Sequence, residues 1–117
     1  VFGCTGSRDR KKRPIMMRDA CNNSKYAIIT SDDLHDEEFS SILTDMLVDN
    51  NNSNFEVIPD RGLAIKRGIS LLKEKDILLI LGKGHEEAII VKDKRIPFND
   101  KKFSMSIIKT MKSKYKI

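Results

Sequence analysis

Two glycines and three polar residues that follow an apolar run are the most informative feature of this sequence. The run covers residues 77–81, and directly after it come Gly82, Lys83, Gly84, His85 and Glu86. An apolar run of this length that ends at glycine is typical of a buried strand in a parallel sheet. Open α/β sheets bind their ligands outside the carboxyl ends of the strands. A cation, an imidazole and a carboxylate at that place predict a site for a small charged ligand.

Polar segments also follow three other predicted strands, at residues 5–9, 31–35 and 59–61. In a parallel sheet all of them lie at the same edge as residues 82–86. The side chains around that edge would be Arg8, Arg10, Lys11, Lys12, Arg13, Asp32, Asp33, His35, Arg61, Lys83, His85 and Glu86. A nucleic-acid surface would be mostly positive, so this mixture of guanidinium and carboxylate groups favours a zwitterion or an amino acid.

Each part of this edge also has a plainer interpretation. Asp32 and Asp33 can cap a helix, and His85 can be a local hydrogen-bond partner. The basic residues 10–13 suit a solvated helix entry, and the two glycines suit a tight turn. Their common placement at one edge is what favours a site.

The elements that position these segments alternate along the chain. Apolar runs predict strands at residues 1–4, 26–30, 55–58 and 77–81, with an amphipathic helix after each of the first three. Two further runs predict a hairpin turned at Asp93 and Lys94, and a last helix follows it. This order predicts an α/β fold, a three-layer sandwich with a mostly parallel sheet and a C-terminal antiparallel hairpin.

Helix starts also leave a signal in the sequence. Pro14 suits the first turn of the first helix. Asp36, Glu37 and Glu38 suit the positive end of the second helix, and Asp60 can cap the third.

Composition sets limits on the class of protein. The chain has 117 residues and a net charge of +5, which suits one domain and an anionic partner. Aromatic residues make up only 6%, and no base-stacking motif is visible, so we expect no nucleic-acid partner. Two cysteines without a CxxC motif and without a signal peptide predict a reduced, cytoplasmic protein. No apolar run approaches the roughly 18 residues that cross a membrane.

Several catalytic motifs are missing. The sequence has neither the GxGxxG dinucleotide motif nor the GxxxxGK[ST] P-loop, and no nucleophile elbow. Two histidines without a cysteine pair argue against zinc, and we expect no metal site in this domain. The sequence begins within a predicted strand and without methionine, from which we expect a fragment of a longer protein.

The motifs resemble a known family. The first is Gly3-Cys4-Thr5-Gly6-Ser7-Arg8-Asp9-Arg10-Lys11-Lys12-Arg13-Pro14. It is similar to the start of the C-terminal domain of the Mur ligases, where the pattern is approximately GxxGDRDxxKRP. The branch that it resembles most is MurE, the UDP-N-acetylmuramyl-tripeptide synthetases. Later segments agree in order and spacing: Thr30-Ser31-Asp32, Asp60-Arg61 and Gly82-Lys83-Gly84-His85-Glu86.

The resemblance implies that residues 1–117 are the Rossmann-like, amino-acid-binding domain of a three-domain cytoplasmic enzyme. The N-terminal UDP-binding domain and the central domain, which binds most of the ATP and Mg²⁺, would be absent from this chain. The implied reaction phosphorylates the D-Glu γ-carboxylate of UDP-MurNAc-L-Ala-D-Glu, and the amino group of a diamino acid then attacks the acyl phosphate. We expect a monomer, no catalytic residue in this domain, and an inactive isolated fragment.

The resemblance also implies the amino-acid site: Arg8, Asp32, Asp33, His35, Gly82 and Glu86. Arg8 would bind a carboxylate of the incoming amino acid, since a guanidinium suits bidentate carboxylate recognition. Gly82 and Glu86 would hold its distal end. Asp9, Arg61, Lys83 and His85 are candidates for a supporting or nucleotide-contacting role.

The specificity segment departs from the family. Diaminopimelate-adding members have DNPR, whereas this chain has Asp32-Asp33-Leu34-His35. His35 replaces an arginine that would pair with the second carboxylate of diaminopimelate, and its charge depends on pH. Diaminopimelate, lysine, ornithine and lanthionine all remain open as substrates. A related ligase with another acidic substrate and a non-catalytic anion- or nucleotide-binding module are the alternative functions.

Overall fold

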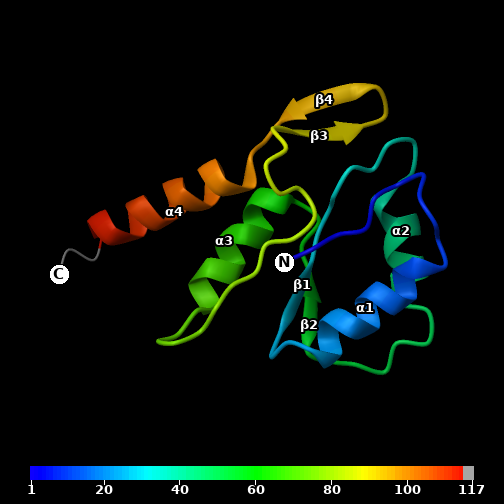
Figure 1. Ribbon diagram of the computed structural model, residues 1–117, viewed down its shortest axis with the longest axis horizontal. Helices are drawn as coiled ribbons and strands as arrows, with labels where there is room; N and C mark the ends of the chain where they lie inside the picture. The colour runs from blue at the N-terminus through cyan, green and yellow to red at the C-terminus, as the bar shows by residue number, and fades with distance from the viewer. Residues whose placement is uncertain (115–117) are drawn as a thin grey trace.

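The chain is an α/β domain in a computed structural model, which describes residues 1–114 (Figure 1). Within them, the helices are α1 (Lys12–Asn22), α2 (Phe39–Met46), α3 (Arg61–Leu71) and α4 (Asp100–Lys114). The strands are β1 (Ala27–Ile29), β2 (Phe55–Val57), β3 (Ala88–Val91) and β4 (Lys94–Pro97). The predicted combination of a parallel sheet with a C-terminal antiparallel hairpin is confirmed.

The small parallel sheet carries the core. β1 pairs with β2, with Ala27 opposite Phe55. On the other side of β1, the Phe2 amide donates to the Ile28 carbonyl (3.1 Å) and the Phe2 carbonyl accepts from the Thr30 amide (2.9 Å). Every residue of β1 is buried, as its apolar sequence predicts for a central strand.

The apolar run at residues 77–81 is not the buried strand that the sequence predicts. The terminal ammonium of Val1 donates to the Leu79 carbonyl (2.8 Å), and the Leu81 amide donates to the Val1 carbonyl (2.9 Å). These two bonds make one parallel pairing. Ile77, Leu79 and Leu81 are 84%, 62% and 54% exposed, so the run forms an exposed edge.

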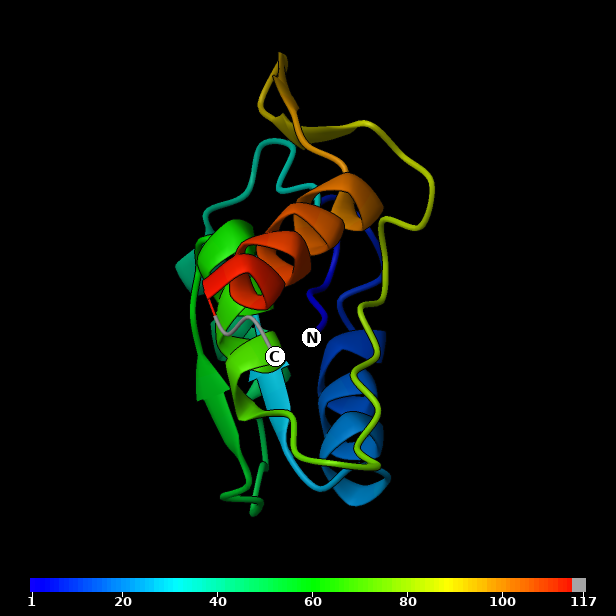
Figure 2. The ribbon, with the colours of Figure 1, turned by 90° about the vertical axis from the view of Figure 1, so that its left-hand side faces the viewer.

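The helices pack in two pairs. α1 packs against α2. α3 lies beside α4, as Figure 2 shows, and contacts β1. The α1 and α2 side of the sheet holds the apolar core, which consists of Phe2, Cys4, Met17, Cys21, Ala27, Ile29, Ile42 and Met46. Met17 and Cys21 are four residues apart and face inward together, as the helical spacing predicts.

Three local predictions have clear outcomes. The Asp60 carboxylate caps α3 by accepting from the Leu63 amide (2.9 Å), as expected. Residues 36–38 lie just before α2, at its positive end as expected; α2 begins at Phe39 with Glu38 as its N-cap, and the Glu38 side chain makes no capping hydrogen bond. The hairpin turns at Lys92 and Asp93, because Val91 pairs with Lys94; the predicted position is wrong by one residue.

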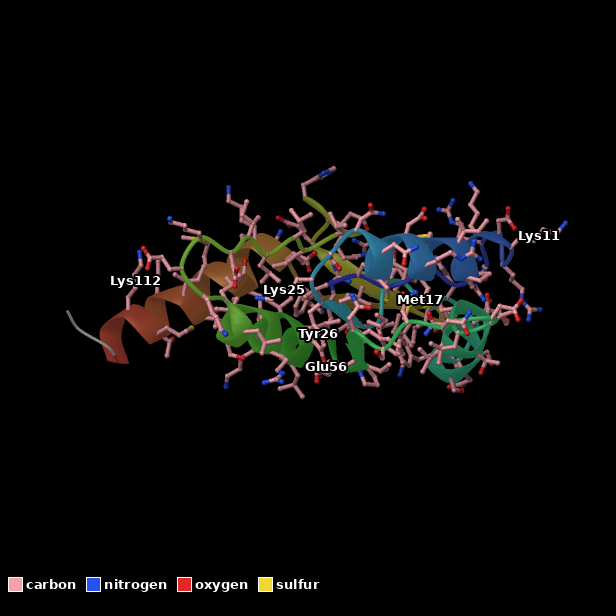
Figure 3. The ribbon with its side chains drawn as sticks, turned by 90° about the horizontal axis from the view of Figure 1, so that it is seen from below. Lys11, Met17, Lys25, Tyr26, Glu56 and Lys112 are labelled. Atoms are coloured by element: carbon pink, nitrogen blue, oxygen red, sulfur yellow. The ribbon has the colours of Figure 1, made fainter. Side chains whose placement is uncertain are left out.

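The molecule is long and flat, with extents of 47 × 35 × 19 Å. Figure 3 shows Lys11 and Lys112 at its opposite ends. Among residues 1–114, no helix combines the length and the apolar character that crossing a membrane requires.

Candidate functional site

A buried lysine joins two of the predicted polar segments. The Lys83 ammonium lies 2.6 Å from Asp33 Oδ1, 2.8 Å from Glu86 Oε2 and 3.8 Å from Asp32 Oδ1. Lys83 is only 2% exposed. The structure thus brings the segment after β1 and the segment after residues 77–81 to one place, as the parallel arrangement predicts.

The two aspartates of this cluster sit in different electrostatic environments. Burial raises the pKa of Asp32, and a hydrogen bond from the Asp33 amide and the charges of Arg61 and Lys83 only partly offset it. Burial also acts to raise the pKa of Asp33, but hydrogen bonds from Lys83 and the Ile90 amide outweigh it and lower the pKa. The pKa of Lys83 is raised, since the bonds to Asp33 and Glu86 outweigh its own desolvation. Asp33 and Lys83 are therefore a charged pair at neutral pH.

The hairpin fixes the segment that carries the predicted specificity residues. Asp33 Oδ1 accepts from the Ile90 amide (2.8 Å), and the amides of Leu34 and His35 donate to the Ile90 carbonyl (2.9 and 3.3 Å). The Lys92 amide donates to the His35 carbonyl (2.6 Å). His35 has a positive φ of 52°, and its half-buried side chain has no hydrogen-bond partner among the described residues. β3 thus sets where His35 lies.

The loop that carries Arg8 lies against the same segment. The Gly6 amide donates to the Asp33 carbonyl (2.7 Å). A Cβ on Gly6 would collide with the Leu34 carbonyl, so only glycine allows the two segments to come so close. Arg8 itself is exposed and makes no hydrogen bond or ion pair within residues 1–114. Its guanidinium remains available to a ligand.

Gly82 and two of the supporting candidates have different environments. Gly82 has a φ of 110°, and a Cβ there would meet the Asp32 carboxylate, so both the backbone and the space require glycine. Asp9 is exposed and accepts from the Lys11 amide (3.0 Å). His85 is exposed and has no partner among the described residues.

Arg61 lies inside the fold. It forms a bidentate pair with Asp100 on α4 (2.7 and 2.8 Å) and donates to the carbonyls of Ser31 and Leu81 (3.0 Å each). Its side chain is 1% exposed. Arg61 orders the edge of the sheet, and its guanidinium is not open to a ligand here.

The basic residues 10–13 have different environments, although Arg10 and Arg13 share Asp45 as a partner. Arg10 is exposed and binds Asp45 (2.8 Å), while Lys11 and Lys12 extend into water. Arg13 is 1% exposed and binds both Glu37 and Asp45. The sequence interpretation overlooked Glu37, which it assigned to the start of α2; its spacing of two residues after His35 was the available signal.

The residues do not fit a magnesium site. The carboxylates of Asp32, Asp33 and Glu86 lie around the Lys83 ammonium. Within residues 1–114 no group of three or more Asp, Glu, His or Cys side chains could hold a metal ion.

Known proteins share this sequence and fold. Residues 1–84 match the family described as "Mur ligase, glutamate ligase domain". A UDP-N-acetylmuramoyl-L-alanyl-D-glutamate–2,6-diaminopimelate ligase of Clostridium acetobutylicum is 47% identical over 86% of this chain, and one of Clostridium botulinum is 41% identical over 93%. A solved structure of a ligase with the same name covers 94% of the chain, with a TM-score of 0.87 and 32% identity.

The chain spans only part of these relatives. It covers 21% and 23% of the two clostridial ligases and 24% of the chain in the solved structure. The match therefore concerns less than a quarter of the length of each of these proteins.

Proposed function

This chain belongs to the Mur ligase family, and from that premise we propose that it is the amino-acid-binding domain of an ATP-dependent 2,6-diaminopimelate ligase. The whole enzyme would join the amino acid to the D-Glu γ-carboxylate of UDP-MurNAc-L-Ala-D-Glu in the synthesis of peptidoglycan precursors. The observation that carries this proposal is the similarity to ligases named for that reaction, at 40–47% identity over at least 86% of the chain.

The proposed domain roles follow the family. Residues 1–117 would form the Rossmann-like, three-layer C-terminal domain. ATP and Mg²⁺ would be bound by the rest of the enzyme, because the described residues offer no group for the metal. A UDP-linked substrate and ATP support a cytoplasmic enzyme, and a monomer remains our expectation.

Three segments supply the proposed amino-acid site. Arg8 presents an exposed guanidinium with no partner among the described residues, which suits a carboxylate. The loop that carries it contacts the Asp32-to-His35 segment, and that segment reaches Glu86 through Lys83. A ligand with a carboxylate at one end and an ammonium at the other would meet Arg8 and Glu86.

The charge of Asp33 bears on which diamino acid is used. Taken alone, Asp33 favours a substrate with a free distal ammonium, such as lysine. Its carboxylate, however, is 2.6 Å from the Lys83 ammonium and also accepts from the Ile90 amide. Because Asp33 is already paired with Lys83, its charge gives no reason to prefer lysine over diaminopimelate. We therefore propose diaminopimelate, whose second carboxylate His35 would face.

The test is Arg8→Ala in the full-length enzyme, measured by phosphate release with UDP-MurNAc-L-Ala-D-Glu and ATP. We expect the KM for diaminopimelate to rise more than about tenfold, because a charge-assisted bidentate pair contributes more than about 1.4 kcal/mol. Arg18→Ala is the matched control, since Arg18 is exposed on α1. An unchanged KM in Arg8→Ala removes Arg8 from the site.

A panel of diamino acids tests the substrate. Turnover of diaminopimelate above lysine, ornithine and lanthionine supports the proposal. Turnover of lysine or ornithine alone would contradict diaminopimelate as the substrate. No turnover with any of the four amino acids would point to a divergent ligase or a binding module.

A further inference from the structure

One carboxylate ties the Arg8 loop to the segment of His35. Glu37 Oε1 accepts from the Ser7 amide (2.7 Å) and from Arg13 Nη2 (2.8 Å), and Oε2 accepts from Arg13 Nη1 (3.0 Å). Arg13 Nη2 also donates to the Thr5 carbonyl (3.2 Å). Glu37 and Arg13 therefore hold the loop at two backbone positions on either side of Gly6.

The position of these bonds in the chain gives them a consequence for the site. Ser7 directly precedes Arg8, and Glu37 follows His35 by two residues. Ser7 has a φ of 57°, a conformation that costs a non-glycine residue about 1 kcal/mol or more and persists only when its surroundings hold it. The bond from the Ser7 amide to Glu37 acts on this residue directly, whereas the other bonds that hold the loop are made by Gly6 and Thr5. Without that bond the loop would relax and carry Arg8 away.

We propose that Glu37, oriented by the buried Arg13, is a positioning residue that sets the separation of Arg8 and His35 and thereby the affinity for the diamino acid. This inference rests on the proposed function. Glu37 touches no substrate in this scheme. It acts through the Ser7 amide and the Arg8 loop.

Asp45 on α2 is the matched control. Like Glu37, it binds the Arg13 guanidinium, at 2.9 Å from Nη1, and its other partner is the exposed Arg10. Within the described residues it makes no bond to residues 5–8 or to residues 32–37, and Arg10, its partner in the loop, lies two residues after Arg8. Removing the Asp45 charge takes one partner from Arg13 and leaves the bond between Ser7 and Glu37 in place.

The experiment compares Glu37→Ala, Glu37→Gln and Asp45→Asn with the unchanged full-length enzyme. We expect Glu37→Ala to raise the KM for diaminopimelate at least about tenfold, with kcat and the KM for ATP within about threefold. Glu37→Gln should recover a substantial part of this loss, because its amide oxygen still accepts from the Ser7 amide. Asp45→Asn should stay within about threefold of the unchanged enzyme in every constant.

A second measurement reports on the loop itself. Amide hydrogen exchange at residues 6–8 should be faster in Glu37→Ala than in Asp45→Asn, because only the first loses the bond to Ser7. Equal KM values or equal exchange in these two variants would overturn the positioning role while leaving the proposed ligase intact. An unchanged enzyme that turns over no diamino acid would overturn the proposed function, and with it the substrate-positioning role.

Discussion

At the scale of single residues, Glu37 and Asp45 are the carboxylates whose charge the fold favours most clearly. Hydrogen bonds from Arg13 and the Ser7 amide lower the pKa of Glu37 to about 2. A hydrogen bond from Arg10, joined by one from Arg13, lowers the pKa of Asp45 to about 2. Asp32 has the opposite tendency, because burial raises its pKa. The two carboxylates around Arg13 therefore contribute to stability in acid.

The pH dependence follows from these pKa values. Glu37 and Asp45 have ordinary values of 4.5 and 3.8. Since the folded values are lower, their contribution to stability is complete above about pH 5 and is lost as the pH falls toward 2. Urea unfolding from pH 6 to 2 should show a shallower loss of unfolding free energy in Glu37→Gln than in the unchanged chain. Glu74→Gln, at an exposed position, should follow the unchanged chain, and parallel curves for all three would contradict this assignment.

The same scale shows how far sequence alone identifies a site. The residue types and the spacing of Arg8, Asp33 and Glu86 indicate a ligand site. The structure brings together the three segments to which they belong. The burial of Lys83 among three carboxylates could not be predicted, because a lysine that follows a glycine is equally compatible with a solvent-exposed position. The pairing of Glu37 with Arg13 could not be predicted either, because 24 residues separate them and they meet only through the packing of α1 on α2.

At the scale of elements, the turn between β3 and β4 is built without glycine. Lys92 has a positive φ of 57°, whereas Asp93 does not. Two-residue hairpin turns favour glycine or asparagine at positions with positive φ. The Lys92 amide of this strained turn donates to the His35 carbonyl (2.6 Å), so the hairpin supports residues 32–35.

Lys92→Gly should stabilise the hairpin. Glycine adopts a positive φ without the cost of about 1 kcal/mol that a side chain brings, and it keeps the amide that binds His35. A higher thermal midpoint than in the unchanged chain is the expected result. Asp93→Gly is the control and should give no gain, because Asp93 has no strain of this kind to relieve; an equal gain from both would argue against strain at Lys92.

Elements with strong local signals are the ones that sequence predicts well. The helical spacing of Met17 and Cys21 and the cap at Asp60 depend on neighbours in the chain, and both are confirmed. Residues 77–81 carry an equally strong strand signal, yet their burial depends on what packs against them, which no local pattern contains. The acidic residues 36–38 likewise suit a helix start, but tertiary contacts of Glu37 with Arg13 and Ser7 decide their place.

At the scale of the whole molecule, Arg61 joins parts of the chain that are far apart in sequence. From α3 it binds Asp100 on α4 and the carbonyls that follow β1 and end the run at 77–81. Both charged side chains of the pair are buried. The arrangement of the α3 and α4 pair against the sheet therefore depends on one guanidinium.

Arg61→Met should lower the free energy of unfolding by about 3–5 kcal/mol, because it leaves the Asp100 carboxylate buried without its partner. Denaturant unfolding measures the change. Arg67→Met is the control: Arg67 is on the same helix but pairs with Glu56 near the surface, with 47% of its side chain exposed, and should change stability little. If both variants lost similar amounts of unfolding free energy, the burial of the pair between Arg61 and Asp100 would not explain the loss in Arg61→Met.

The edge at residues 77–81 has a practical consequence for the isolated chain. Ile77, Leu79 and Leu81 present apolar side chains to water. Among the described residues, Val1 alone bonds to their backbone through its own main chain, and the Arg61 side chain binds the Leu81 carbonyl. An apolar strand edge of this kind is a template for edge-to-edge aggregation between molecules. Leu79→Lys would place a charge at the centre of that edge, as natural proteins do to prevent such pairing, and would be the first modification to make when the domain is prepared on its own.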